Sequence, residues 1–362
     1  MSLKTSKPFL QLKKAYSGLS GRDRYALVYD VDPDGLSSAV IAARVLTRKT
    51  GRKPAVVFPY IHGKTKLDGR FLRSLKAKKV GYCFFFDISI DQFPKELRRL
   101  SRQANVIVFD HHKIYNTFHR NGIIIIKPQL VQKRIIPSQY CTSKLTYDVL
   151  NLIQPIPELA WIASLGIIGD SAFRTWKGFL NRVMGGRILK NGEEIFNTEL
   201  GKATQLVSYM MIADPKKHRR LFNILLNSSS VRQLLKSEIG QYGHVAREIN
   251  SYLRQYKAKA EFHKKFIFYS IRPIYMIGSI LSTLIGNLNP NKTVIIVQPM
   301  DRKMFRISAR RLDYKVRVNS VLENVIGRLP FSSAGGHVPA AGGTIRKKDY
   351  RKFVKRLKDA LK

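Results

Sequence analysis

The chain has 362 residues, enough for one large or two medium-sized domains with well-filled cores. Hydrophobic residues make up 44% of it, as in globular proteins, and no apolar run is long enough to span a membrane. Lysine and arginine outnumber aspartate and glutamate by 65 to 24, a formal net charge of +41, which favours nucleic acid as the partner. A basic bias of the whole proteome, or a salt-rich or ribosome-rich cytoplasm, is the alternative explanation.

Residues 1–20 are predicted to be a basic lead-in, and residues 1–14 lack the apolar core of a secretory signal. The only two cysteines, Cys83 and Cys141, lie in apolar contexts, which predicts neither a structural disulfide nor a zinc site. We therefore expect a reducing, cytoplasmic location and no attachment to a membrane.

Apolar runs alternate with helical patterns through the first third of the chain. Strands are predicted at 25–29, 55–58, 81–86, 106–109 and 123–126. Helices are predicted between them at 36–49, 70–78 and 94–104. This alternation predicts an α/β fold with a doubly wound, mainly parallel sheet.

From Pro155 the pattern is helical, with a helix at 158–168 and helices and loops through 173–260. Strands return at 265–271, 293–297 and 304–308, with helices at 276–288, at 320–328 and after Asp349. We therefore predict a first domain over 1–205, a helical connector over 206–260, and a smaller α/β domain over 261–362.

Three predicted strands of the first domain end in a carboxylate, namely Asp30, Asp87 and Asp110. In open α/β sheets the ligand site lies just beyond the carboxyl ends of the strands. Three carboxylates along one sheet edge repel one another unless cations hold them. A metal site is therefore expected at this edge.

Other oxygen and nitrogen ligands lie close to these strand ends in the sequence. The acidic candidates and one imidazole are Asp30, Asp32, Asp34, Asp87, His111 and Asp170. Carboxylates favour Mg²⁺ or Mn²⁺, an added imidazole favours Mn²⁺, and this number of ligands suits two ions that act on a phosphate ester. The spacing Asp30-x-Asp32-x-Asp34-Gly35 also suggests a calcium loop, but Ile41 stands where that loop needs glutamate.

The second half of the chain offers groups that suit a phosphate. The glycine-rich run 334–343 is predicted to be a loop with backbone N–H groups and His337 available, and a plain flexible turn is its alternative. Basic stretches at 301–317 and 343–362 strengthen the phosphate interpretation. Arg310 is either a phosphate contact or a surface charge.

Taken together, these motifs resemble the DHH phosphoesterases with a C-terminal DHH-associated domain. Asp110-His111-His112 is the signature, the run from Asp30 to Gly35 resembles the first motif, Asp87 the second, and Gly169-Asp170 the fourth. The associated domain's motifs are matched by Ser308-Ala309-Arg310 and by Gly335-Gly336-His337 with Ala340-Ala341-Gly342. The resemblance covers nearly the whole chain in the correct order, although Ala334 and Val338 depart from the usual glycine and proline.

The resemblance implies a role for each motif residue. One Mn²⁺ would be held by Asp30, Asp32 and Asp87, and a second by Asp34, Asp87, His111 and Asp170. The catalytic residues would be Asp87, Asp110 and His112, with His112 touching the scissile phosphate. The far end of the substrate would be held by Ser308, Arg310, Gly335, Gly336 and His337.

The first motif begins with Asp30 rather than histidine, which resembles RecJ-type exonucleases that degrade single strands from the 5′ end. We therefore expect an Mn- or Mg-dependent nuclease of archaeal RecJ-like type, acting on single-stranded DNA or RNA, with replication or repair proteins as possible partners. One alternative is a nanoRNase or oligoribonuclease, or a cyclic-dinucleotide or phosphoadenosine phosphatase. Another is a non-catalytic scaffold in replication or repair. The basic excess favours the long polymer, and the complete ligand set favours an enzyme.

Overall fold

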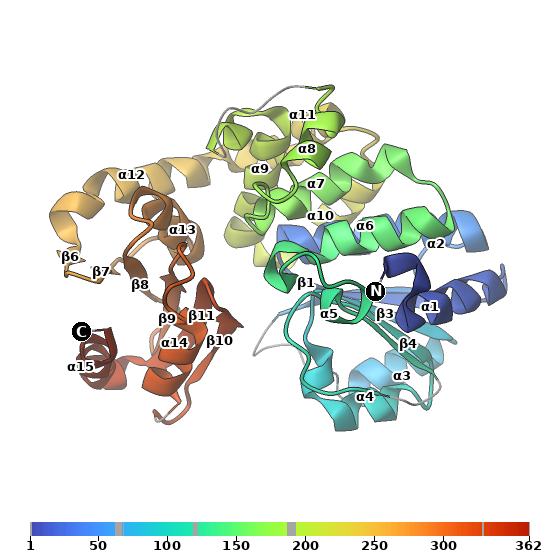
Figure 1. Cartoon of the computed structure of the whole chain (residues 1–362), viewed down its shortest axis with the longest axis horizontal. Helices are drawn as coiled ribbons and strands as arrows, with labels where there is room; N and C mark the ends of the chain where they lie inside the picture. The colour runs from blue at the N-terminus through green and yellow to red at the C-terminus, as the bar shows by residue number, and fades with distance from the viewer. Residues whose placement is uncertain are drawn as a thin grey trace. The chain divides into compact units, whose positions relative to one another are not determined.

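The computed structural model describes residues 2–61, 67, 69–118, 122–186, 193–327 and 329–361, without the side chains of Glu193 and His337. The chain divides into two compact units, Met1–Gly240 and Gln241–Lys362 (Figure 1). The predicted boundaries at 205 and 260 stay a prediction. Within the described residues, no helix combines the length and the hydrophobicity that crossing a membrane requires.

The first unit is built on a parallel sheet with the strand order β2-β1-β3-β4-β5. Its strands are β1 (Tyr25–Asp30), β2 (Val56–Tyr60), β3 (Tyr82–Phe86), β4 (Asn105–Phe109) and β5 (Ile123–Ile126). All five start and end within two residues of the predicted bounds. The strand order reverses beside β1, which confirms the predicted doubly wound sheet.

Helices cover both faces of this sheet (Figure 1). The helices of the first unit are α1 (Lys7–Gly18), α2 (Pro33–Thr50), α3 (Gly69–Ala77), α4 (Pro94–Leu100), α5 (Pro128–Val131), α6 (Thr142–Ile153), α7 (Ala160–Gly169), α8 (Lys177–Val183), α9 (Glu199–Ala213), α10 (His218–Asn227) and α11 (Val231–Lys236), of which α8, α9 and α11 lie on other helices. Apolar residues of α3 and α4 form one core with alternate residues of β1, β3 and β4. Residues of α1, α2 and α6 pack against the other face of β3 and β4.

Most of the predicted basic lead-in at 1–20 is the helix α1, which was not predicted. Phe9, Leu12 and Tyr16 are buried along one side of this helix, and the Ser6 hydroxyl accepts a hydrogen bond from the Phe9 N–H at its start. Spacings of three and four residues put these side chains on one face. The intervening lysines obscured that pattern in the sequence.

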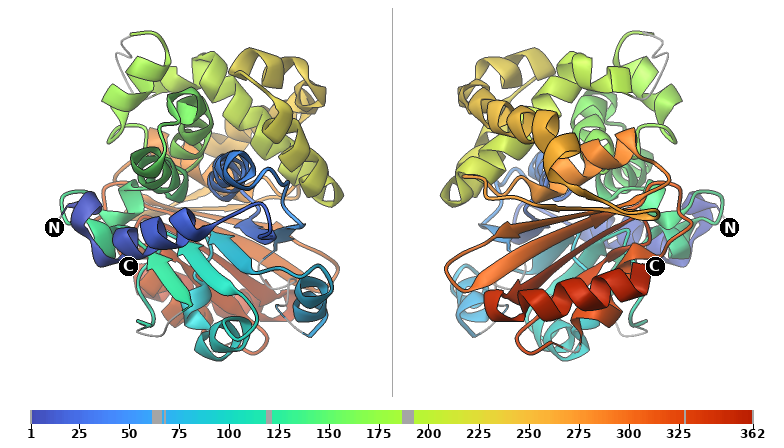
Figure 2. Two further views of the ribbon diagram at one scale, coloured as in Figure 1. Left: turned by 90° about the vertical axis from the view of Figure 1, so that its right-hand side faces the viewer. Right: turned by 90° about the vertical axis from the view of Figure 1, so that its left-hand side faces the viewer.

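The second unit contains a sheet with the order β10-β11-β9-β8-β7-β6, in which only β7 and β8 are parallel among the described strands. The strands are β6 (Glu261–Phe262), β7 (Phe266–Ser270), β8 (Thr293–Pro299), β9 (Met304–Arg310), β10 (Ser333–His337) and β11 (Ala340–Arg346). The helices are α12 (His244–Lys259), α13 (Gly278–Leu288), α14 (Val318–Ile326) and α15 (Tyr350–Leu361). Figure 2 shows α15 on the face of the sheet opposite to α12 and α13. This confirms the predicted second α/β domain.

The prediction of a loop over the glycine-rich run 334–343 is wrong, because this run forms the hairpin of β10 and β11. Burial alternates along β11, where Ala341, Gly343 and Ile345 are buried. A Cβ on Gly343 would lie 2.6 Å from Ile326 Cδ1, so glycine lets α14 pack closely on the hairpin. Glycine is rare in strands, and composition therefore concealed the pairing.

Candidate metal centre

The polar strand ends of the first sheet lie side by side. Asp30 ends β1, while Asp87 and Asp110 directly follow β3 and β4. Tyr29 is in register with Phe86, and Phe86 with Phe109, so the three carboxyl ends are level with one another. The sheet topology therefore puts these carboxylates along one edge, as the sequence predicted.

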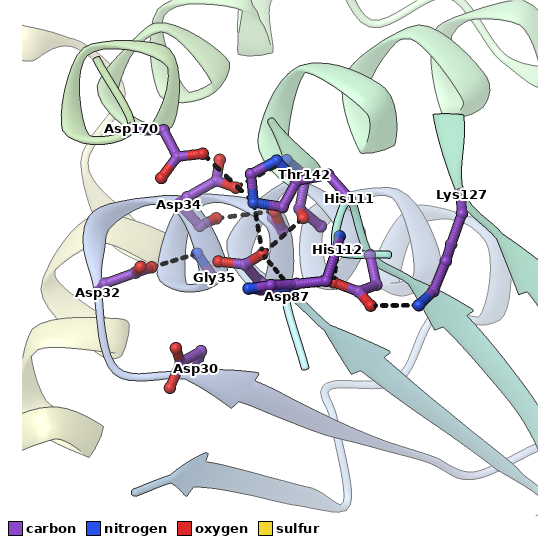
Figure 3. Close-up of polar contacts among 12 residues, drawn as sticks. Asp30, Asp32, Asp34, Gly35, Asp87, His111, His112, Lys127, Thr142 and Asp170 are labelled. Carbon is purple, nitrogen blue, oxygen red and sulfur yellow. Dashed lines mark hydrogen bonds and ion pairs between the residues drawn. The ribbon is translucent and has the colours of Figure 1, made fainter. Parts of the chain in front are cut away.

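The predicted metal ligands form three overlapping groups, within each of which the candidate ligand atoms lie within 4.8 Å of one another (Figure 3). The groups are Asp30, Asp32 and Asp87; Asp34, His111 and Asp170; and Asp87, His111 and His112. Two residues are shared, because Asp87 belongs to the first and third groups and His111 to the second and third. All six predicted ligands are thus brought together with His112.

The N-terminal turn of α2 places Asp32 and Asp34. The Asp32 carboxylate caps the helix by accepting the Gly35 N–H at 2.8 Å. A Cβ on Gly35 would lie 2.5 Å from the Asp30 carbonyl oxygen, so only glycine allows the turn to fold back so tightly. Asp34 is buried and accepts the N–H groups of Thr142 at 2.7 Å and Ser143 at 2.9 Å. The N–H groups at the start of α6 therefore fix the position of Asp34.

Asp87 has a left-handed backbone with a φ of 61°, which is costly for a residue other than glycine and least so for asparagine or aspartate. Its N–H donates to the Phe109 carbonyl at 2.9 Å, and its Oδ1 accepts the Thr142 hydroxyl at 2.8 Å. These bonds hold the backbone in this conformation. Strain of this kind concentrates at functional sites.

The His111 imidazole lies between two carboxylates. Its Nε2 is 3.4 Å from Asp87 Oδ1 and 3.4 Å from Asp170 Oδ2. Burial, and then the charge of His112, lower the pKa of His111 to about 4. The ring is therefore neutral at neutral pH, which is the form that binds a metal ion.

The carboxylates of the cluster disfavour one another's charge. The pKa of Asp87 is raised by burial and then by Asp34 and Asp32. The pKa of Asp32 is raised by burial and then by Asp30 and Asp34. Cations bound among these oxygens would remove both effects. An oxygen-rich set with a neutral imidazole fits Mn²⁺ or Mg²⁺.

Asp110, predicted to be catalytic, points away from the clustered ligands and towards His112. Its Oδ1 lies 2.6 Å from His112 Nδ1, and its Oδ2 lies 2.9 Å from Lys127 Nζ. Burial alone would raise the pKa of Asp110, but His112 and Lys127 lower it below its usual range. Burial alone would lower the pKa of His112, but Asp110 raises it. An ionised carboxylate only accepts, so His112 Nδ1 carries the proton in this bond.

The predicted substrate-binding residues lie on neighbouring strands of the second unit. Ser308 and Arg310 of β9 are in register with Gly342 and Ala340 of β11, which pairs in turn with β10. The last three residues of β10 are Gly335, Gly336 and His337. The His337 side chain lies outside the described residues. The sheet thus brings the two predicted motifs onto three adjacent strands.

Several residues that support the site were missed from the sequence. Thr142 contacts both Asp34 and Asp87, and Lys127 and Asp91 lie behind Asp110. A helix-start signal, the polar pair Thr142-Ser143 before an apolar run, was available for α6. No motif marks Lys127 or Asp91.

Gly166 on α7 is another residue whose role only the structure reveals. A Cβ there would lie 2.1 Å from Ser143 Oγ and 2.4 Å from Asp34 Oδ1. We therefore expect Gly166→Ala to lower the free energy of unfolding by about 1–3 kcal/mol, the usual cost of overpacking. We also expect it to weaken Mn²⁺ binding by displacing Asp34. Urea unfolding and Mn²⁺ titration measure the two effects.

Gly18→Ala is the matched control, because a Cβ on Gly18 meets nothing within 4 Å. It should leave Mn²⁺ affinity unchanged. Unaltered stability and metal affinity in Gly166→Ala would contradict the close packing of α7 on Asp34.

Comparison with known proteins agrees with this architecture. Residues 25–167 match the DHH family, N-terminal domain, and residues 274–362 match the DHHA1 domain. No curated protein sequence matches the chain significantly.

Solved structures share the fold at low sequence identity. The structure of RecJ with Mn²⁺ from Thermus thermophilus is 19% identical to this chain, with a TM-score of 0.69. The match covers 99% of this chain and 55% of the RecJ chain, so this chain spans about half the length of that RecJ. A manganese-bound exonuclease RecJ is 19% identical with a TM-score of 0.65, covering 100% and 96% of the two chains. CDC45 from Entamoeba histolytica is 11% identical with a TM-score of 0.62, covering 98% and 99%. The two family domains, in this order and on a RecJ-like fold, show that the chain belongs to the DHH family.

Proposed function

We propose that the protein is a metal-dependent phosphodiesterase that removes nucleotides from the 5′ end of single-stranded nucleic acid, as RecJ-type exonucleases do. One observation carries the proposal. Asp87 belongs to two candidate ligand groups, one with Asp30 and Asp32 and the other with His111 and His112. His111 also belongs to the third group, with Asp34 and Asp170. A carboxylate shared between two ligand sets suits two-metal hydrolysis of a phosphate ester.

Each ligand set would hold one Mn²⁺ or Mg²⁺ ion. The first ion would be held by Asp30, Asp32 and Asp87, and the second by Asp34, Asp87, His111 and Asp170. When bound, such ions lower the pKa of water and offset the charge that develops on the phosphate. The manganese present in the two RecJ structures supports Mn²⁺ as the first ion to test.

His112 would contact the substrate rather than serve mainly as a metal ligand. Its Nδ1 donates to Asp110, so the opposite ring nitrogen would donate to an oxygen of the scissile phosphate. Asp110 raises the pKa of His112, which favours the charged imidazole, and charge strengthens that hydrogen bond. Asp110 would act by orienting this ring.

Two features support a long single strand as the substrate. The net charge of +41 suits a polyanion better than a dinucleotide. A cavity of about 400 Å³ also lies along β2, where the charged residues among its described lining are Arg70, Lys78 and Arg219. The partly buried ring of Phe58 also lines it, 5.0 Å from the ring of the core residue Phe71. Proteins that bind single strands combine cations with aromatic faces in this way.

The decisive experiment compares Mn²⁺-dependent release of mononucleotides from a long single strand and from oligomers of two to five nucleotides. Strands labelled at the 5′ or the 3′ end report the polarity, and DNA and RNA versions report the sugar preference. We expect faster turnover of the long strand. Equal or faster turnover of the shortest oligomers would favour the nanoRNase and small-nucleotide phosphatase alternative. Strand binding without hydrolysis would favour the non-catalytic replication or repair scaffold, which the fold likeness to CDC45 makes worth testing.

Arg310 tests the proposed role of the second unit. If its guanidinium binds a substrate phosphate, Arg310→Ala should lower kcat/KM about tenfold to a hundredfold, since a charge-assisted hydrogen bond contributes roughly 1.5–3 kcal/mol. Mn²⁺ affinity should not change, because every proposed metal ligand lies in the first unit. Steady-state kinetics and Mn²⁺ titration on a short oligomer and a long strand measure both quantities. Wild-type kinetics would make Arg310 a surface charge, and lost Mn²⁺ binding would contradict its assignment to the substrate.

A further inference from the structure

Behind His112 lies a fully buried chain of charged groups (Figure 3). Asp110 Oδ1 is hydrogen-bonded to His112 Nδ1 at 2.6 Å, and Asp110 Oδ2 forms an ion pair with Lys127 Nζ at 2.9 Å. The same Lys127 Nζ lies 3.0 Å from both carboxylate oxygens of Asp91. The side chains of Lys127, Asp91 and Asp110 are all 0% exposed.

The Lys127 ammonium group has partners on three segments of the chain. It donates hydrogen bonds to Asp91 and, at 2.8 Å, to the Lys113 carbonyl, and it forms an ion pair with Asp110. Partners on three segments fix the position of this group. Lys127 therefore holds Asp110 in one orientation, with Oδ1 turned towards His112.

The segment that follows the Asp-His-His signature is tied to the same chain of groups. Asp91 Oδ2 accepts the Tyr115 N–H at 2.8 Å, and the Asp91 carbonyl accepts the Asn116 side-chain amide at 2.8 Å. Gln129, two residues after Lys127, donates to the His112 carbonyl at 3.0 Å. The backbone and the imidazole of His112 are thus both positioned from the Lys127 region.

Stability alone does not account for this arrangement. Buried ion pairs are weak stabilisers, and apolar residues of similar volume often replace them without loss. We infer that Lys127 is a positioning residue, which orients His112 through Asp110 for contact with the scissile phosphate. This inference rests on the proposed function for its kinetic consequence, but the orientation of His112 is testable without catalysis.

The test is Lys127→Met, which keeps the length of the side chain and removes the ammonium group. Loss of a residue that holds a site residue in place typically lowers activity about ten- to a hundredfold, and we expect a decrease of this size in kcat. KM for the strand and the half-saturating Mn²⁺ concentration should stay within about twofold, since neither ligand set changes. Lys127→Gln keeps two N–H donors and should lose less, so it also covers the case in which the methionine variant does not fold.

Lys144→Met is the matched control. Lys144 is also buried, pairs with Asp148 and lies over the Trp176 ring, but it contacts none of the proposed site residues in the described contacts. Its removal should leave kcat per folded molecule unchanged, with folding monitored by thermal unfolding. An equal loss of kcat in Lys144→Met would overturn the specific role of Lys127.

Two further readouts separate positioning from a structural role. In a His112→Gln background, Lys127→Met should cause little additional loss, because both changes act through one imidazole. In the resting protein, the imidazole N–H resonance of His112, assigned by its absence in His112→Gln, should shift or disappear in Lys127→Met and persist in Lys144→Met. Full additivity of the two losses, or an unchanged resonance, would overturn the inference. A wild-type protein without hydrolysis would overturn the proposed function alone, since the resonance does not depend on turnover.

Discussion

Asp87→Asn is expected to abolish hydrolysis while the protein stays folded. Asp87 is the carboxylate shared between two candidate ligand groups, so its neutral analogue should weaken the binding of both proposed ions. Bound metals contribute several kcal/mol of transition-state stabilisation, and we expect kcat to fall at least about a thousandfold. Single-turnover hydrolysis of a labelled strand at saturating Mn²⁺ measures this loss.

Asparagine is the appropriate replacement because of the backbone at this position. The φ of 61° is tolerated by asparagine better than by alanine, so the variant adds little strain. The asparagine oxygen can still accept the Thr142 hydroxyl. Substantial remaining activity at saturating Mn²⁺ would contradict a bridging role for Asp87.

The same substitution should stabilise the metal-free protein at neutral pH. Burial and neighbouring carboxylates raise the pKa of Asp87 in the folded state. The folded protein therefore binds more protons than the unfolded chain above the ordinary carboxyl pKa, and its stability falls as pH rises through that window. Asp87→Asn removes this contribution, so its free energy of unfolding in chelator should decline less than that of the wild type between about pH 5 and 7.5. A parallel pH dependence of the two proteins would contradict the charge repulsion.

His112→Gln is expected to lower kcat by about a hundredfold to ten-thousandfold, the range of a lost side chain that transfers or donates a proton in the transition state. The His112 ring is hydrogen-bonded to Asp110, which belongs to none of the three candidate ligand groups, so Mn²⁺ affinity should change much less than kcat. Rapid-quench kinetics and Mn²⁺ titration measure the two quantities.

The neighbouring histidine offers the matched comparison. His111 Nε2 faces Asp87 and Asp170, and its pKa of about 4 keeps it neutral. His111→Gln should therefore raise the half-saturating Mn²⁺ concentration and recover part of its activity at high Mn²⁺. If both variants lose Mn²⁺ affinity to the same degree, His112 is a metal ligand and its assignment to the phosphate is wrong.

The outline of the fold was readable from the sequence where local patterns coincide with local structure. The apolar runs ending at Asp30 and Phe109 are buried strands whose length alone marks them. The helix α1 and the β10–β11 hairpin were not predicted, for a common reason. The buried residues of α1 have helical spacing and those of β11 alternate, but lysines in α1 and glycines in the hairpin make both patterns hard to recognise. Which of these residues are buried depends on the elements that pack against them.

The sequence by itself determined that Asp30, Asp87 and Asp110 share one edge of the sheet, because the carboxyl ends of neighbouring parallel strands lie side by side. Only the tertiary structure decided how the candidate metal ligands around them are held. The Thr142 hydroxyl reaches Asp87 across 55 residues, and Lys127 reaches Asp91 across 36. The tertiary structure also decided that the carboxylate of Asp110, the first residue of the Asp-His-His signature, faces His112 rather than the clustered carboxylates. Such contacts join segments far apart in the chain, and no local pattern of charge or hydrophobicity encodes which buried lysine will meet which carboxylate.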